Sequence, residues 1–189
     1  MKAPEPGAQG VMPSRMWLEV RGLLALMLLT QARRAARFDG ERFVPLAEQD
    51  RGRWNRELIA EGHALVRTCL AAGQPGPFQI QAAINAVHTD GEATDWRMVL
   101  DLYDLWLRVA PTPVVRLNRA VALAEVAGPE VALGIVEELG LVDYQPWQVA
   151  RGHLLRELGR VEESRAAYRL ALDLTDSSAE RAHLAGLAE

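Results

Sequence analysis

The sequence predicts an all-α fold of stacked antiparallel helical hairpins, the arrangement called an α-solenoid. One observation is the segment 111–139, where an apolar helix over residues 114–126 is followed by a break at Gly128 and a second amphipathic run. A similar pair of runs recurs over residues 147–174, with its break at Gly159. Helical hairpins in tandem bury a core only by stacking on their neighbours, and such stacks present concave surfaces to partners.

The composition is that of a folded protein in a reducing compartment. The chain has 189 residues, of which 49% are hydrophobic and 24% charged, so it can bury a substantial core. The single cysteine, Cys69, cannot form an internal disulfide, which favours a cytoplasmic setting. The strongest apolar run, residues 23–29, is far shorter than the roughly 20 residues that cross a bilayer. It also lies too deep in the chain for a signal peptide, so we expect no membrane or export role.

Charge is distributed unevenly along the chain. Residues 1–60 contain ten Lys or Arg and seven Asp or Glu, a net charge of +3, whereas residues 61–189 carry a net charge of −7. Because non-specific nucleic-acid affinity depends on clustered cations, we expect no direct DNA binding by this chain. One basic cluster consists of Arg33, Arg34, Arg37, Arg42, Arg51, Arg53 and Arg56. Two interpretations stay open: solvated cations that offset a helix C-terminal dipole, or a contact with an anion or a protein.

The first elements follow from caps and breakers. Residues 1–13 contain Pro and Gly without periodicity and are predicted to be a flexible lead to a single helical domain over residues 14–189. Ser14 is a candidate N-cap for a helix over residues 16–36, which is apolar on nearly all sides and is therefore expected to be buried. Residues 38–49 interrupt this pattern with an Asp-Gly turn and a short extended piece.

The next helices alternate with clear turns. Asp50 is expected to cap a helix that ends at Gly73, with Trp54, Leu58, Leu65 and Leu70 as candidates for its inward side. A third helix is expected over residues 78–89, with Ile80, Ile84 and Val87 on one stripe. A fourth, capped by Thr94 or Asp95, is expected to run to residue 109. The remaining helices are predicted over residues 114–126, 129–139, 146–158, 161–174 and 179–189.

The last hairpin resembles a tetratricopeptide repeat. Its small and aromatic positions are matched by Gly152, Gly159, Ser164, Tyr168 and Ala171. Three positions depart from the family: Gln148 replaces a common Trp, Arg151 a common Leu and Asp176 a closing Pro. The match implies a divergent repeat in residues 111–189, and residues 14–110 form a helical half of a different kind.

A search for catalytic or metal-binding residues yields none. Four histidines lie on separate helices without a Cys, Asp or Glu at metal-ligand spacing, and such residues are more often packed than ligating: His63, His88, His153 and His183. The adjacent carboxylates Glu137-Glu138 and Glu162-Glu163 point about 100° apart on a helix and cannot share a substrate atom. We therefore expect no enzyme activity, cofactor or metal.

Several strings in a fixed order resemble the helical C-terminal extension of a group of extracytoplasmic-function RNA polymerase sigma factors. The likeness covers about residues 18–183. The strings are LALMLL at 24–29, ARRAAR at 32–37, EQDR at 48–51, RW at 53–54, GPFQIQAAINAVH at 76–88, TDW at 94–96, LY at 102–103 and PVVRLNRAVA at 113–122.

The resemblance implies a regulatory module that modulates transcription initiation through contacts with sigma-factor core regions, RNA polymerase or a regulatory protein. Family members carry two DNA- and polymerase-binding regions ahead of this extension, and neither is found in this chain, so we expect a fragment of a sigma factor or a free-standing relative. The polar family positions that match are Arg33, Arg34, Asp50, Arg51, Trp54, Gln81, His88, Asn118 and Arg119. A purely structural role as caps and interhelix bonds stays open for all of them.

An enzyme or small-ligand binder is the alternative, and it would use a groove between helices with His88 and Asn118 as its polar anchors. A free-standing helical scaffold protein is a further alternative function. In the family a helical pair usually precedes the element that matches residues 24–29, and we do not find that pair in this sequence. We therefore expect the first helix to expose apolar residues and to form a homodimer. Those residues are Leu23, Leu24, Leu26, Met27 and Leu28.

Overall fold

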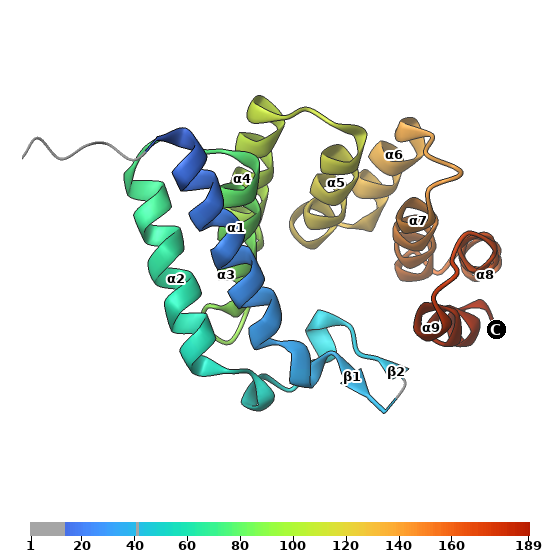
Figure 1. Cartoon of the computed structure of the whole chain (residues 1–189). Helices are drawn as coiled ribbons and strands as arrows, with labels where there is room; N and C mark the ends of the chain where they lie inside the picture. The colour runs from blue at the N-terminus through green and yellow to red at the C-terminus, as the bar shows by residue number, and fades with distance from the viewer. Residues whose placement is uncertain (1–13, 41) are drawn as a thin grey trace, which may run out of the picture.

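The computed structural model describes residues 14–40 and 42–189, and these are predominantly α-helical, as predicted (Figure 1). The predicted lead, residues 1–13, lies outside the described residues. The α-helices are α1 Arg15–Ala32, α2 Arg56–Ala71, α3 Pro77–Thr89, α4 Trp96–Val109, α5 Pro113–Ala127, α6 Pro129–Leu139, α7 Gln145–Glu157, α8 Val161–Asp173 and α9 Ser178–Ala188. Three short 3₁₀ turns are η1 Arg34–Ala36, η2 Leu46–Glu48 and η3 Arg51–Arg53.

The first helix is shorter than the sequence predicted. We expected it to continue to residue 36, but α1 ends at Ala32 and the chain tightens into η1. The backbone amide of Asn55 donates to the Ala32 carbonyl over 2.9 Å, and the amide of Ala36 donates to Arg33 three residues back. The carbonyl that would continue the α-helix is thus occupied by another segment, which favours the tighter turn.

A two-stranded antiparallel hairpin follows, made of β1 Phe38–Asp39 and β2 Arg42–Phe43. The predicted turn is confirmed, since Gly40 adopts the left-handed conformation at φ 61° that glycine accepts without steric cost. Phe38 and Phe43 pair across the strands, and their rings meet edge to face at 6.1 Å.

The cap of the second helix was predicted at the wrong residue. Asp50 accepts a hydrogen bond from the Gly52 amide and caps η3 instead. Asn55 caps α2, because its side-chain oxygen accepts from the amides of Glu57 and Leu58. The expected inward position of Leu70 was also wrong, since that side chain is 51% exposed, whereas Trp54 is buried as expected.

Helix α1 lies against both α2 and α3, at two points of close approach. A methyl group on Gly22 would sit 2.7 Å from the backbone nitrogen of Gln79 in α3. A methyl group on Gly62 of α2 would sit 2.7 Å from the Leu29 side chain. The core between these helices contains Ala25, Leu29, Val66, Ala82 and Ala83.

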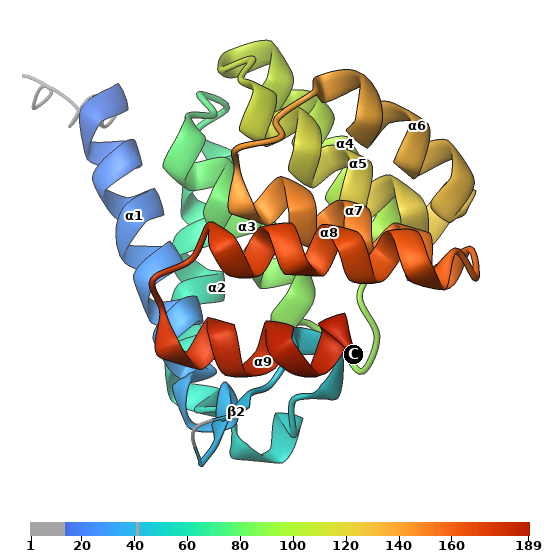
Figure 2. The ribbon, with the colours of Figure 1, turned by 90° about the vertical axis from the view of Figure 1, so that its right-hand side faces the viewer.

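One side of α1 remains open, so the expectation of a helix buried all round is wrong. The expected exposure of its apolar residues is confirmed for Leu23, Leu24 and Met27, whereas Leu26 and Leu28 are partly buried. Helix α1 contacts α2 and α3 but none of α4–α9, and Figure 2 shows its N-terminal end at one edge of the described structure. Its buried side is the one toward α2 and α3, and the opposite side exposes large apolar side chains such as Met16 and Met27. Apolar composition all round a helix predicts burial, but two neighbouring helices cover only part of its circumference.

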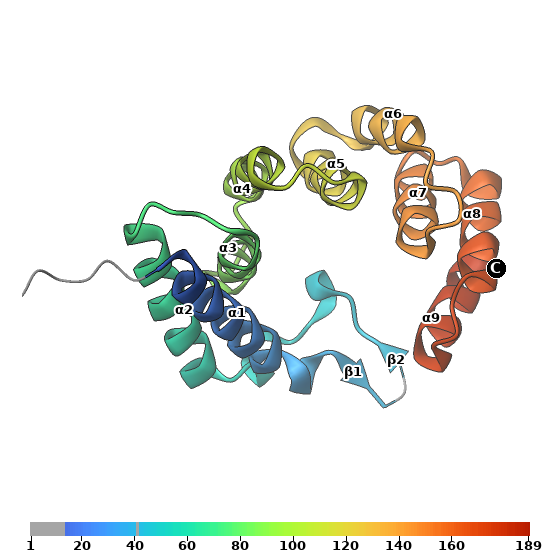
Figure 3. The same ribbon diagram turned by 45° about the horizontal axis from the view of Figure 1, so that its top comes forward.

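From α3 to α9, each helix contacts the next one along the chain. Figure 3 shows that this succession curves into an arc, and the hairpin bridges the space between its two ends. Strand β2 contacts α9, and the ring of Phe43 meets that of His183 edge to face at 5.8 Å. The hairpin thereby links the two halves of the chain.

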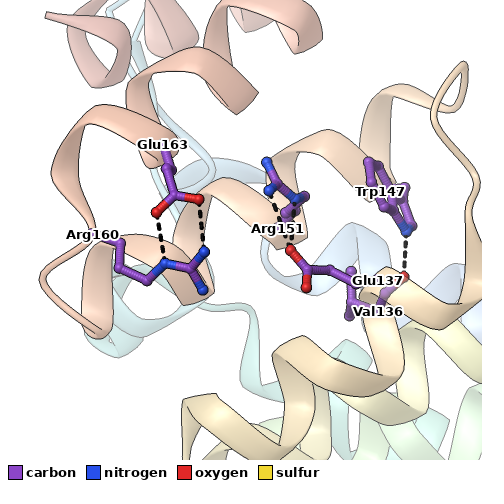
Figure 4. A network of polar contacts seen from close by, with 6 residues as sticks. All are labelled: Val136, Glu137, Trp147, Arg151, Arg160 and Glu163. Atoms are coloured by element: carbon purple, nitrogen blue, oxygen red, sulfur yellow. Dashed lines mark hydrogen bonds and ion pairs between the residues drawn. The ribbon is translucent and has the colours of Figure 1, made fainter.

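Polar contacts join the C-terminal helices (Figure 4). The indole N–H of Trp147 in α7 donates to the Val136 carbonyl of α6 over 2.7 Å, and Arg151 donates to Glu137 over 3.2 Å. In α8, Ser164 donates to the Gly152 carbonyl of α7 over 2.7 Å, and the Tyr168 ring lies against Gly152. None of the helices in the described ranges is long and apolar enough to span a membrane.

We predict that Gly22→Ala destabilises the protein, because the added methyl group meets backbone atoms of α3 that cannot move aside easily. The free energy of unfolding should fall by about 1–3 kcal/mol, measured by chemical denaturation. Gly134→Ala is the matched control, since its added methyl group has open space within α6. That control should raise stability by roughly 0.5–1 kcal/mol through helix propensity. Equal effects at both positions would contradict the close packing of α1 on α3.

Candidate functional site

The candidate site lies where the C-terminal end of α1 meets η3 and α3. Each of these elements contributes one of three central residues: Arg33 directly follows α1, Arg51 begins η3, and His88 lies in the last turn of α3. Two N-caps set the local fold. Asp50 caps the start of η3, and Asn55 caps the start of α2 while its backbone amide donates to the end of α1. We call Arg33, Arg51, Trp54, Asn85 and His88 the arginine cluster.

Arg33 is half-buried and points at α3. Its Nη2 donates to the side-chain oxygen of Asn85 over 2.9 Å, and the Asn85 amide in turn donates to the Gln81 carbonyl over 3.1 Å. Its Nε atom is buried, with no hydrogen-bond partner among the described residues. Burial, and secondarily the positive charge of Arg37, lowers the pKa of Arg33. The guanidinium is thus desolvated without being fully bonded, which is costly for a charged group.

Arg51 covers the buried indole of Trp54. Its guanidinium carbon lies 4.7 Å from the centroid of the Trp54 ring, a cation–π contact. Its Nη1 donates to the Gly91 carbonyl over 2.8 Å, which ties η3 to the loop after α3. Trp54 is 4% exposed, and its indole N–H has no partner among the described residues. Neither Arg33 nor Arg51 forms an ion pair with a described carboxylate.

His88 is held in its neutral form. Burial, followed by the charges of Arg33 and Arg51, lowers the pKa of His88 to about 4. Its Nδ1 lies 3.3 Å from the Thr94 hydroxyl, and its ring meets the Trp96 ring edge to face at 5.4 Å. At neutral pH, the positive charge of the cluster therefore comes from the two arginines alone.

The other residues singled out in the sequence have different surroundings. Arg34 is exposed in η1, and Asp50 is occupied by its cap. Gln81 contributes its backbone carbonyl to the cluster. Arg119 lies on α5, where its Nε is 2.6 Å from Asp104 of α4 and the pair joins the two helices. Its neighbour Asn118 is half-buried on the same helix.

Sequence reasoning missed Asn85, the direct partner of Arg33. The signal was available, because Gln81, Asn85 and His88 are spaced at i, i+4 and i+7 and so share one face of α3. The contact from Arg33 to Asn85 crosses 52 positions of the chain, and helical periodicity says nothing about which helices become neighbours. Among the described residues no three His, Cys, Asp or Glu side chains are arranged to hold a metal ion.

The described residues form a predominantly helical protein with a half-buried arginine cluster. Residues 10–70, which include α1, the hairpin and the arginines that follow it, match the model of a family of unknown function (DUF6596). The chain is 44% identical over 172 residues to uncharacterized protein R00370 of Rhizobium meliloti (strain 1021). That alignment covers 88% of this chain but 41% of the relative, so the chain spans less than half the length of the protein it matches. No solved structure matches the chain.

We predict that His88 makes stability depend on pH. Its folded pKa of about 4 lies below the ordinary value of 6.5, so the unfolded chain binds a proton more readily. Stability is therefore complete above pH 6.5 and decreases as the pH falls towards 4. Between pH 7.5 and 5 the free energy of unfolding should fall by about 2 kcal/mol through this residue.

The measurement is urea denaturation at both pH values for the wild type and for His88→Gln, which cannot titrate. The variant should lose most of the difference between the two pH values, whatever its absolute stability. His153→Gln, a change at an exposed histidine on α7, should keep the wild-type dependence. The same pH dependence in His88→Gln and the wild type would show that this residue is not its source.

Proposed function

We propose that this chain is a cytoplasmic protein-interaction module that modulates transcription initiation by contacting sigma-factor core regions or RNA polymerase. The ordered strings over residues 18–183 that resemble the extension of extracytoplasmic-function sigma factors support this proposal. The Rhizobium relative is more than twice as long as its matched segment, as expected for a module that works beside further regions. The same proposal assigns no catalytic step to the chain.

The observation that carries the proposal is the state of Arg33 and Arg51. Both guanidiniums are half-buried, and neither pairs with a described carboxylate. Buried charges in proteins are normally paired, because an unpaired one loses hydration without compensation. A partner that brings a carboxylate would supply the missing interaction, and arginine binds such groups with two parallel hydrogen bonds.

The arc of helices fits a scaffold role for the rest of the chain. We infer that α5–α8 form divergent tetratricopeptide-like hairpins of an α-solenoid. The contacts of Gly152 with Tyr168 and Ser164 support this inference, since small and aromatic residues interlock at the corresponding positions of such repeats. Arg119 and Asp104 then serve to fix one helix against the next.

A second candidate function is small-ligand binding in the concave side of the arc. A pocket of about 390 Å³ lies between β2, α5, α7 and α9, and its walls are mainly apolar. Phe43, Val149, His153, His183 and Leu184 are among its lining residues. Ala150→Trp would fill this pocket. If the chain is an interaction module, the variant should bind the sigma core as the wild type does. If the chain binds a small ligand here, the variant should lose the thermal stabilisation that the ligand gives the wild type.

We predict that the chain binds an isolated sigma core, or RNA polymerase, with a dissociation constant in the micromolar range or below, as measured by calorimetry. Arg51→Ala should weaken that binding by about tenfold, because it removes a cation at the proposed contact. Arg169→Ala, a change of an exposed arginine on α8, is the control and should leave affinity unchanged. Absence of binding at micromolar concentrations to both targets would reject the proposal.

A further inference from the structure

The exposed side of α1 is unusually apolar. Opposite its buried residues, the helix presents a continuous strip that we call the α1 face: Met16, Trp17, Val20, Leu23, Leu24 and Met27, which are 37–69% exposed. At 100° per residue these side chains share one side of the helix, and Gln31 is the polar residue that continues it. A strip of this kind on a soluble protein marks an interaction surface.

Arginines outnumber acidic residues beside the α1 face. Arg15, Arg21 and Arg34 are exposed along the helix and at its end. The single acidic residue of α1 is Glu19, and its carboxylate is hydrogen-bonded to the start of α3. It accepts from the Phe78 amide over 3.1 Å and from the Gln79 side chain over 2.8 Å. Glu19 keeps its negative charge, but these two bonds hold its carboxylate against α3, so a partner on this face meets more arginines than acids.

A basic hollow continues the α1 face at its C-terminal end. It measures about 620 Å³ and lies between the end of α1, η3 and the start of α2. Arg34 and Arg53 line it together with Gln31, Asn55 and Leu58. Asp50, the acid adjacent to η3, is bonded to the Gly52 amide. The apolar strip and the hollow thus form one surface, apolar along its length and cationic at one end.

We propose that this surface binds an acidic amphipathic helix of a partner protein. The partner's apolar stripe lies along the α1 face and its carboxylates reach the bordering arginines and the hollow. At 1.5 Å per residue the strip is about 16 Å long, so an occupant of roughly three turns covers it. This inference rests on the proposed function, because it specifies the chemistry of the partner that the proposed module contacts.

The charges favour this occupant over two others. A second copy of the chain would place the same arginines opposite each other, and like charges at an interface oppose association. A membrane-surface helix lays its apolar face on the lipid and carries its cations on the opposite face. The opposite face of α1 is instead buried against α2 and α3, and the protein carries a net charge of −4.

The test uses the full chain and two synthetic 16-residue helical peptides with the same leucine stripe, one flanked by Glu and the other by Lys. Fluorescence anisotropy should show the Glu peptide binding at least about tenfold more tightly at low salt, and the difference should shrink at high salt. The double variant Val20→Glu/Leu24→Glu should weaken Glu-peptide binding by at least about tenfold. Arg34→Glu/Arg53→Glu should reverse the preference between the peptides.

The matched control is Val131→Glu/Leu170→Glu, because these residues on α6 and α8 are as exposed as Val20 and Leu24. It should bind the Glu peptide like the wild type. Equal affinity for the two peptides, or equal loss in the control, would overturn the inference. A dimer in analytical ultracentrifugation that Val20→Glu/Leu24→Glu abolishes would assign the face to a second copy. Binding to phosphatidylserine vesicles that the same variant abolishes would assign it to a membrane.

The outcome separates this inference from the proposed function. If the peptide preference holds but neither the sigma core nor RNA polymerase binds, the surface stands and the function is wrong. If the sigma core binds and Val20→Glu/Leu24→Glu leaves its affinity unchanged, the function stands and this surface is not the docking site.

Discussion

The seating of α1 between α2 and α3 is the constraint on which the rest of the N-terminal half depends. Gly22 allows the backbone of α1 to approach that of α3, and Gly62 gives Leu29 its place against α2. Interhelical distance is set by the side chains at the contact, so a glycine at the crossing brings the axes close. The close approach buries one side of α1 completely. Because only α2 and α3 cover the helix, the side chains on its opposite side stay exposed to solvent.

The same seating produces the arginine cluster. Because α1 ends beside the last turns of α3, Arg33 lies within hydrogen-bond distance of Asn85. Its positive charge also helps to lower the pKa of His88. A protein rarely keeps cations half-buried without carboxylates for stability alone, since replacement by apolar residues is often neutral or better. The cluster lowers the pKa of its own histidine and leaves buried donors unbonded. These costs are easiest to understand if a partner compensates them.

Much of the helical layout could be predicted, because it is encoded locally. Periodicity and breakers placed α6 at its observed bounds and the other helices within a few residues. The Asp-Gly pair placed the turn, but the sequence did not show that the residues on either side of it pair as strands. Errors arose where two local signals competed. Asp50 and Asn55 are both good caps five residues apart, and only the bond from the Asn55 amide to Ala32 shows which one begins α2. Long-range contacts, such as that between the rings of Phe43 and His183, produce no pattern in the local sequence.

The sequence predicted Arg33, Arg51, Trp54 and His88 of the arginine cluster and the exposure of Leu23, Leu24 and Met27, but it did not show which side of α1 stays open. Residue type indicates what a side chain can bind, whereas exposure depends on how many helices surround it. An apolar helix is expected in a core, yet α1 has neighbours on two sides. Apolar contact alone provides affinity without much selectivity, and the bordering charges add the selectivity. Since residues 61–189 carry a net charge of −7, an acidic partner is disfavoured over the remaining surface and directed to α1.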